Sequence, residues 1–419
     1  MNMLTRRTFV QLSAAATGGF GAPFLGAAEP FSIVVLPDTQ MYNTKPQPNL
    51  FGHQTNWIAQ SIDAEQIVFV TQLGDFTDDG RDATFWKNAL TGIRVLDGKV
   101  PYSICLGNHD LFTGSPDGNG VPNCRKYCTA RSLQGGDTCG GASPDGLSFW
   151  QVFKGGKFSF LHVNLIFSPD AKTLAWAKNV VQANAEKPAI ISTHDYLGMG
   201  GVKSAAGRAI WNGLVKDFPS VLMVLNGHHC SNAKQMSLNA SGGKVVEMLS
   251  NYQDFPNGGE AYLRIIKFVP DKGSIHVKTY SPARKQFIHN IDNEFSFDAE
   301  FNSGENSIDI LGLHGFSHDY ELPYIEHQSG GQVFSASRPA TYSVKAGGTG
   351  PLSYQWMRCT DRALWTTYGG VPIKNATQAS FSTHEKPTPG VPDPSFFVRV
   401  SNKAGSVVSD RVVLKAEKP

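Results

Sequence analysis

The chain has 419 residues, enough for two or three domains, and its 41% hydrophobic content is ordinary for a soluble globular protein. Residues 1–28 hold two arginines and no acidic residue, so the remaining chain has 35 basic and 35 acidic residues and is formally neutral. This balance does not indicate a nucleic-acid partner or attraction to an anionic membrane. No apolar stretch beyond the amino terminus predicts a transmembrane segment.

The first 28 residues place an arginine pair, Arg6 and Arg7, before an Ala/Gly-rich and weakly apolar segment that ends in small residues. This order is typical of a signal peptide with a cleavage site. The run "TRRTFVQL" resembles a bacterial twin-arginine signal, which exports proteins already folded. We therefore expect residues 1–28 to be removed and the protein to be periplasmic or secreted in a bacterium. The alternative is a basic, disordered tail.

From residue 31 to about 280, buried strands and helices alternate. Continuous apolar runs such as "FSIVVL", "QIVFVTQL" and "SVLMVLN" predict strands buried on both faces. Amphipathic runs such as "FGHQTNWIAQSID" and "KTLAWAKNVVQANA" predict the helices between them. Four later runs, from "KQMSLNA" to "SIHVKTYS", predict strands without intervening helices. The pattern predicts a layered α/β sandwich with a mixed sheet over residues 29–300.

Residues 111–148 form a long Gly/Pro/Asn/Asp-rich insertion. Connections of this length are usually functional or disordered. The insertion contains Cys124, Cys128 and Cys139. In an exported protein these cysteines predict one disulfide, with a zinc knuckle as the alternative.

The carboxyl-terminal part changes character. Residues 301–328 lack clear periodicity and are predicted to form a linker. Residues 329–419 read as all-β and resemble the immunoglobulin-like modules of exported bacterial proteins, with Trp356 as the buried tryptophan. The usual disulfide of that fold is missing, because Val398 occupies the position of its second cysteine.

Polar side chains follow five successive strands of the predicted sandwich, where each strand ends. In an open α/β sheet, ligands gather at the carboxyl ends of the strands. Carboxylate, amide and imidazole groups there, several directly behind a glycine, predict a metal site with many ligands. The candidate residues are Asp38, Gln40, Asp75, Asn108, His109, Asp110, His194, His228 and Cys230.

The motifs "GDFTDD", "GNHD", "STHD" and "GHHC" occur in this order at those strand ends. Together they resemble the calcineurin-like metallophosphoesterases, over roughly residues 31–285. The run "VVEMLSNYQDFPNGGEAYLRIIKF" is also similar to one exported branch of that superfamily. The resemblance implies an α/β/β/α sandwich and hydrolysis of phosphate mono- or diesters. Purple acid phosphatases are not matched, because Asp78 stands where their iron-binding tyrosine would be.

The resemblance also implies roles for the candidate residues. Two cations roughly 3.5–4 Å apart would activate a shared water for attack on phosphorus. His109 would protonate or hydrogen-bond the leaving oxygen, and Asp110 would hold its imidazole ring and raise its pKa. Asp75 would bridge the ions, Asn108, His194 and His228 would complete one site, and Asp38, Gln40 and Cys230 would complete the other.

Gln40 and Cys230 depart from the family pattern, because most members have histidine at both positions. An amide oxygen is a weak, hard ligand, whereas a thiolate is soft and strong. Either the second ion still binds, or one ion does the work, so we expect one or two ions of zinc, iron or manganese. His229 is a poor substitute if the segment is extended, since adjacent side chains then point to opposite faces.

Two functions remain open. The first is a phosphoesterase acting on a phosphoester substrate. The second is a catalytically weakened scaffold that binds a glycan or protein at the cell surface, with the carboxyl-terminal domain as the binding module.

Overall fold

The computed structural model describes residues 29–113, 120–128, 138–314, 321–359, 370–388, 391, 393–403 and 405–416. The predicted signal peptide, residues 1–28, lies outside this range, as do parts of the insertion at 111–148. None of the helices within the range is long and apolar enough to cross a membrane.

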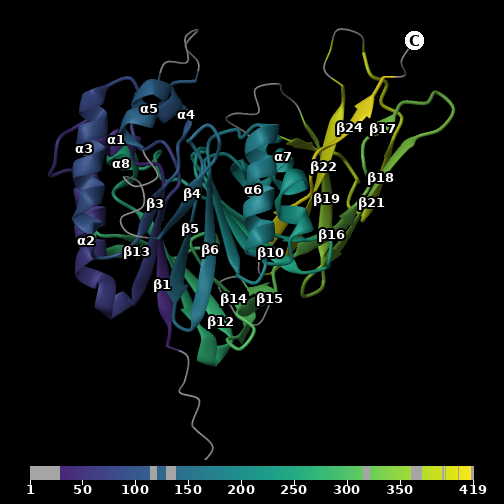
Figure 1. Cartoon of the computed structure of the whole chain (residues 1–419). Helices are drawn as coiled ribbons and strands as arrows, with labels where there is room; N and C mark the ends of the chain where they lie inside the picture. The colour runs from purple at the N-terminus through teal and green to yellow at the C-terminus, as the bar shows by residue number, and fades with distance from the viewer. Residues whose placement is uncertain are drawn as a thin grey trace, which may run out of the picture.

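Two sheets face each other, and helices cover the outer face of each, so the predicted α/β/β/α layering is confirmed (Figure 1). Parallel pairing joins the strands that precede helical crossovers, and antiparallel pairing joins the later strands. In spatial order the first sheet contains β15 (Ser307–His314), β14 (Glu294–Asn302), β12 (Ser274–Ser281), β11 (Leu263–Val269), β1 (Phe31–Leu36), β2 (Ile67–Gln72) and β3 (Tyr102–Ile104), and β13 (Gln286–Ile288) pairs with β12.

The second sheet continues from the sandwich into the carboxyl-terminal region. The link is a single bridge between Ile325 and Ser237. In spatial order this sheet contains β21 (Ser380–Thr383), β18 (Ala340–Gly347), β16 (Tyr324–Gln328), β9 (Asn232–Leu238), β10 (Lys244–Ser250), β8 (Val221–Asn226), β7 (Ala189–Thr193), β6 (Phe158–Leu165), β5 (Phe149–Gly155) and β4 (Cys139–Ala142).

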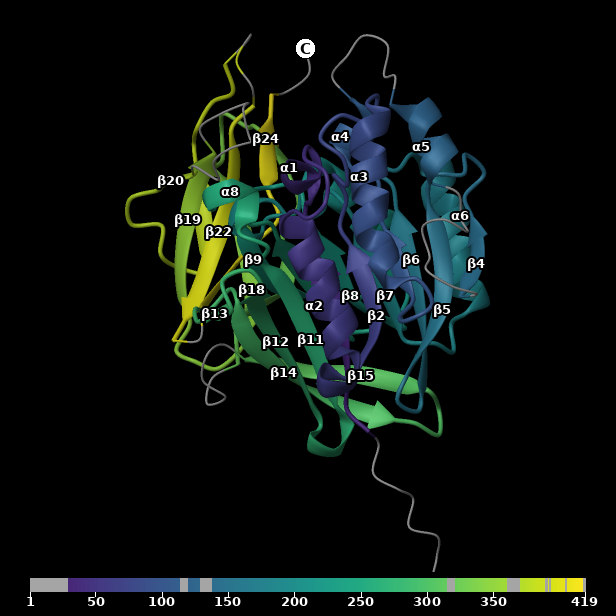
Figure 2. The same cartoon turned by 90° about the vertical axis from the view of Figure 1, so that its left-hand side faces the viewer.

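Helices α2 and α3 lie across the first sheet (Figure 2), and α6 and α7 cover the second. Helix α2 begins where the Asn49 side chain accepts a hydrogen bond from the Gly52 amide, at 3.0 Å. The helices are α1 (Gln40–Asn43), α2 (Leu50–Glu65), α3 (Ala83–Ile93), α4 (Asn108–Leu111), α5 (Val121–Tyr127), α6 (Ala171–Ala183), α7 (Ala205–Gly213) and α8 (Pro256–Gly259), with short 3-10 turns at Arg94–Leu96, Met199–Gly201, Val215–Asp217 and Pro270–Lys272.

Strand β1 shows why these apolar runs form the centre of the molecule. Phe31, Ile33 and Val35 belong to the core between the sheets, whereas Val34 and Leu36 belong to the core under α2 and α3. Each such side chain contributes about 1.5–3 kcal/mol by leaving water. Burial on both faces is therefore what the continuous apolar run predicts.

The linker predicted at residues 301–328 is wrong for two segments. Strands β14 and β15 pair antiparallel and extend the first sheet, and β16 pairs with β18. Strand β15 forms a short hairpin with β14, whereas β16 pairs with a strand of the following domain.

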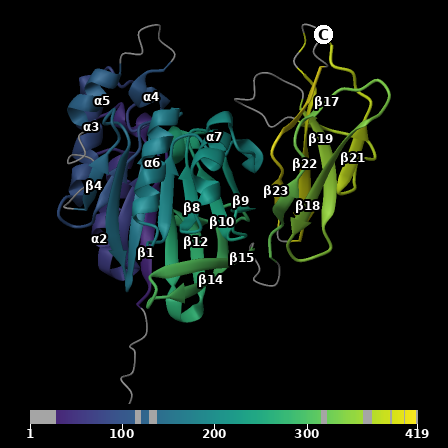
Figure 3. The same ribbon diagram turned by 45° about the vertical axis from the view of Figure 1, so that its right-hand side comes forward.

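The carboxyl-terminal region is an immunoglobulin-like all-β domain beside the sandwich (Figure 3). Trp356 is buried in its core, and its indole N–H donates to the Gln378 carbonyl at 3.0 Å. Val398 lies directly opposite Trp356 in the strand register. The remaining strands are β17 (Gln332–Val333), β24 (Val412–Lys415), β22 (Ser395–Asn402), β19 (Ser353–Cys359), β20 (Gly370–Pro372) and β23 (Gly405–Val408).

The disulfide predicted in the insertion is not formed. All six cysteines are free, with Cys124 and Cys128 buried on α5 and Cys139 exposed on β4. Within the described residues, no cysteine belongs to a group that could hold a metal ion, so the zinc knuckle is not supported either.

Candidate metal centre

Four predicted ligands meet where strands of both sheets end. His194 follows β7, and its Nε2 lies 3.1 Å from Asp75 Oδ2, 3.0 Å from Asn108 Oδ1 and 3.2 Å from His228 Nδ1. Asp75, His194 and His228 form a group whose ligand atoms all lie within 4.8 Å of one another. The structure thus brings together the residues that sequence reasoning assigned to the first ion.

The hydrogen bonding of His194 fits a cation in this group. Its Nδ1 lies 2.9 Å from the Leu73 carbonyl, which can only accept, so Nδ1 carries the proton. Once the ring loses its second proton, Nε2 directs a lone pair toward a carboxylate oxygen, an amide oxygen and another imidazole nitrogen. Atoms of these types together could hold a cation.

The charges of the centre also call for a positive group. Burial alone would lower the pKa of His194, but the carboxylates of Asp75 and Asp38 outweigh it and raise that pKa to about 10. Burial raises the pKa of Asp38 to about 7. A proton on His194 therefore balances the buried carboxylates, and a metal ion can replace that proton.

Backbone geometry positions the Asp75 carboxylate. Asp75 has a φ of 49°, in the left-handed region, directly after Gly74 at 104°. A Cβ on Gly107 would lie 2.1 Å from Asp75 Oδ1. The glycines of "GDF" and "GNH" therefore allow the turn and the close approach that aim Asp75 into the centre.

The second predicted set is assembled less completely. Asp38 is buried and accepts the His228 amide at 3.1 Å. Gln40 Nε2 donates to Asp75 Oδ2 at 3.2 Å, while its buried Oε1 has no partner among the described residues. That orphan oxygen is compatible with a ligand to a cation. Cys230 instead directs its thiol toward Gln253 Oε1 at 3.7 Å, and burial raises its pKa to about 12, which opposes the thiolate.

Asn251 is a site residue that the sequence reasoning missed. Its Nδ2 donates to Asp38 Oδ2 at 2.8 Å and to Gln253 Oε1 at 3.1 Å, so it links Asp38 to the surroundings of Cys230. Asn251 directly follows β10. The rule applied to the other five strands, polar residues at a carboxyl end, would have found it.

His229 lies nearer to this centre than predicted. His228 has a φ of 71°, so the segment is not extended, and the two rings lie 4.6 Å apart. The argument from opposite faces is therefore wrong. His229 Nε2 lies 3.2 Å from Asp195 Oδ1, and with His228 these residues form a second group that could hold a metal ion.

Asp110 does not hold the His109 ring as predicted, although its charge contributes to raising the pKa of His109. Its buried carboxylate accepts hydrogen bonds from the amides of Phe76, Thr77 and Gly107 and from the Thr77 hydroxyl. It therefore fixes the loop that carries Asp75.

The His109 ring is held by its Nδ1, which lies 2.7 Å from the Asp78 carbonyl. Burial lowers the pKa of His109, but Asp75, Asp78 and, to a smaller degree, Asp110 outweigh it, so the pKa is raised.

Metal binding should release protons near neutral pH. In the metal-free protein the pKa of His194 is about 10, so His194 is protonated at pH 7.5 and must lose that proton to bind through Nε2. We expect release of about one proton per ion at the first site and weaker affinity as the pH falls. Calorimetric titration with zinc in buffers of different ionisation enthalpy measures this number. A zinc-binding heat that is independent of the buffer would contradict it.

The described residues thus define a class: a layered α/β/β/α protein whose strand ends carry an Asp/Asn/His centre able to hold a metal ion. The calcineurin-like phosphoesterase family model matches residues 31–232. Residues 31–232 form a calcineurin-like phosphoesterase domain, and an immunoglobulin-like domain follows it.

One curated protein and two solved structures are similar to parts of this chain. The uncharacterized protein YvnB of Bacillus subtilis (strain 168) is 31% identical over 291 residues, which are 68% of this chain. The matching region spans only 22% of the length of YvnB. Purple acid phosphatase PPD1 from yellow lupin (Lupinus luteus) seeds is 16% identical with a TM-score of 0.43, covering 67% of this chain and 56% of its own. GAP50, the anchor in the inner membrane complex of Plasmodium, is 14% identical with a TM-score of 0.40, covering 63% and 89%.

Proposed function

We propose that the protein is an exported, metal-dependent hydrolase of phosphate mono- or diesters. The observation that carries the proposal is the convergence of Asp75, Asn108 and His228 on Nε2 of His194, with His109 beside them. Bound zinc, iron or manganese would polarise the phosphoryl group and supply hydroxide near neutral pH. Export by the amino-terminal signal is part of the proposal.

The residues of the chain have separable roles in this proposal. Asp38 and Asp75 supply the buried negative charge that holds cations. The Asp78 carbonyl fixes Nδ1 of His109 and leaves Nε2 to hold a proton for the leaving oxygen. The side chain of His109 is 41% exposed, so a substrate can reach it.

The variant His109→Ala tests this role. We expect kcat to fall about 100- to 1,000-fold with bound metal unchanged, because the acid is lost but the ligands remain. Turnover of p-nitrophenyl phosphate and bis(p-nitrophenyl) phosphate by manganese- or zinc-loaded protein gives the rates. His327→Ala, at an exposed histidine on β16, is the control. Unchanged turnover in His109→Ala would remove His109 from the mechanism.

The insertion lies against the same loops. Asn123 Nδ2 donates to the Gly80 carbonyl at 3.0 Å, and Cys124 Sγ lies 3.2 Å from the Asp110 carbonyl. We propose that residues 111–148 border the centre and influence which phosphoester is accepted. An unchanged ratio of diester to monoester turnover after Asn123→Ala and shortening of 129–137 would count against this.

A binding scaffold is the second candidate. It is favoured by Cys230, whose thiol bonds to Gln253 instead of joining the group that could hold a metal ion. If the protein is a scaffold, neither ester is hydrolysed with any added metal. The immunoglobulin-like domain then binds a cell-surface glycan or protein. Metal-dependent turnover that Asp75→Asn abolishes would exclude it.

A further inference from the structure

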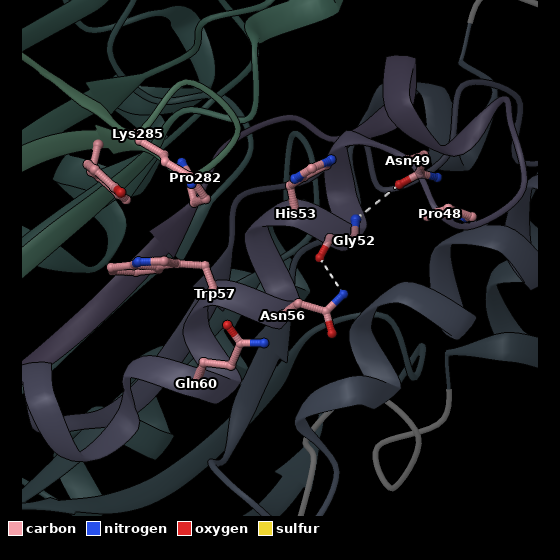
Figure 4. Close-up of a pocket in the computed structure, with 10 residues that line it drawn as sticks. Pro48, Asn49, Gly52, His53, Asn56, Trp57, Gln60, Pro282 and Lys285 are labelled. Atoms are coloured by element: carbon pink, nitrogen blue, oxygen red, sulfur yellow. Dashed lines mark hydrogen bonds between the residues drawn. The ribbon is translucent and has the colours of Figure 1, made fainter.

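A hollow of about 330 Å³ lies between α2 and the turn that joins β12 to β13 (Figure 4). It is separate from the residues of the metal centre, and its volume falls in the range of ligand sites. The helix residues recur every three or four positions and so share one face of α2. The residues that carry the argument are His53, Asn56, Trp57 and Gln60 from the helix, and Tyr280 and Lys285 from the strand side.

Aromatic rings form a row beside this hollow. The rings of Trp57 and Tyr280 lie 5.1 Å apart at 45°, and those of Tyr280 and Phe287 lie 4.8 Å apart at 44°. Trp57 and Tyr280 are half-buried and pack against the core under α2, so their orientation is held by the fold. Phe287 is 42% exposed. The row offers fixed apolar faces at little cost in conformational entropy.

Polar groups around the rings are available to a ligand. Within the described part of the chain, the side chains of His53, Gln60 and Lys285 make no hydrogen bond or ion pair. Asn56 Nδ2 donates a hydrogen bond to the Gly52 carbonyl at 2.8 Å, which leaves the Asn56 Oδ1 to accept one from a ligand. Lys285 has a φ of 54°, an uncommon backbone for a lysine, at the turn that presents it to the hollow.

A second hollow, of about 370 Å³, is lined in part by Phe287. It is lined by Lys267, Lys272 and Lys278, with Glu65 at the end of α2. Two of these lysines have carboxylates nearby, Lys267 with Glu65 at 3.9 Å and Lys278 with Glu294 at 3.7 Å. The surface along α2 is therefore elongated, aromatic and mildly positive.

We propose that this surface binds an acidic glycan. The C–H face of a sugar ring stacks on Trp57. The Asn56 Oδ1 accepts from one sugar hydroxyl, and the Gln60 amide can donate to and accept from its neighbours. Lys285 pairs with the carboxylate or sulfate of the sugar. The second hollow accommodates further sugar units past Phe287.

The same features favour a glycan over a single-stranded nucleic acid. Stacking platforms in a strongly cationic groove characterise proteins that bind single strands. Here Lys285 is the only lysine or arginine among the described residues that line the hollow beside Trp57, so the groove is not strongly cationic. The positive charges of Lys267 and Lys278 are already paired with the carboxylates of Glu65 and Glu294.

An array of neutral and acidic oligosaccharides probed with the full chain tests the proposal, followed by calorimetry with the strongest acidic oligosaccharide. We expect the full chain to bind acidic oligosaccharides. Trp57→Ala should weaken this binding about 10-fold or more. Lys285→Gln should weaken the binding of acidic oligosaccharides but not the binding of neutral ones. Trp176→Ala, also a half-buried tryptophan on a helix but on α6, should leave binding unchanged.

Three results would overturn the proposal: no array signal, equal binding by Trp57→Ala and wild type, or tighter binding to single-stranded oligothymidylate than to any glycan. Thermal unfolding shows whether Trp57→Ala still folds. If it does not, Gln60→Ala and Lys285→Gln decide, because both side chains are exposed and unbonded, and full binding by both would refute the site.

Discussion

The Asp75→Asn protein is expected to bind no metal ion tightly and to hydrolyse phosphoesters on the order of 100- to 1,000-fold more slowly, the loss of several kcal/mol of transition-state stabilisation. Asp75 is buried, and Oδ2 faces both His194 Nε2 and Gln40 Nε2. Asparagine keeps the shape of the side chain and tolerates the left-handed backbone at this position. The expected loss is therefore one of charge, while the fold is preserved.

Metal content by plasma mass spectrometry and turnover of both p-nitrophenyl esters measure the effect. Asp79→Asn makes the same chemical change at an aspartate that pairs with Arg81 outside the centre, and it should behave as wild type. Two retained equivalents of metal in Asp75→Asn would show that Asp75 does not bridge the ions.

Glu247→Gln is expected to cost about 3–5 kcal/mol of unfolding free energy, the largest effect on stability. Glu247 is fully buried on β10 and lies 3.0 Å from the buried Lys203 ammonium. It also accepts the Tyr196 hydroxyl at 2.7 Å and the Ser237 hydroxyl at 3.1 Å. Glutamine preserves the volume but leaves the Lys203 charge without its counter-charge in a region of low dielectric.

Thermal and urea unfolding measure this cost, and a fall in Tm of about 10 °C is expected. Lys278→Gln, which removes the exposed partner of the half-buried Glu294, should change stability by less than about 1 kcal/mol. The double variant Glu247→Gln with Lys203→Met should cost less than the sum of the singles, because neither charge is then stranded. A Glu247→Gln protein as stable as wild type would show that Lys203 finds its compensation elsewhere.

Much of the fold follows from local patterns. The run "FSIVVL" predicted a strand buried on both faces, and β1 is buried along its whole length. Helix α2 begins and ends within two residues of the predicted run at 51–63. These elements were predictable because burial and period are properties of a short stretch of sequence. Strand β15 was missed, although its buried Ile308 and Ile310 alternate with the exposed Asp309 and Leu311.

The site divides in the same way. The residues that follow the strands could be found in the sequence, because the carboxyl end of a buried strand appears there as an apolar run that stops at a polar residue. The partners of those residues were not visible. The left-handed φ of His228 turned His229 toward the centre, and the Asp78 carbonyl, not Asp110, holds the ring of His109. Backbone dihedrals and carbonyl positions leave no trace in residue identity.

The sequence alone therefore determined which residues follow each buried strand, because apolar residues are buried and polar residues mark where burial ends. These polar residues are the candidate ligands of the centre. Only the tertiary structure showed which of these candidate ligands lie close enough together to hold one ion. Asp75, Asn108 and His228 each have an atom within 3.2 Å of His194 Nε2. Cys230 turns to Gln253 instead. That choice depends on distances between strands of different sheets, and those distances are set by packing across the whole sandwich.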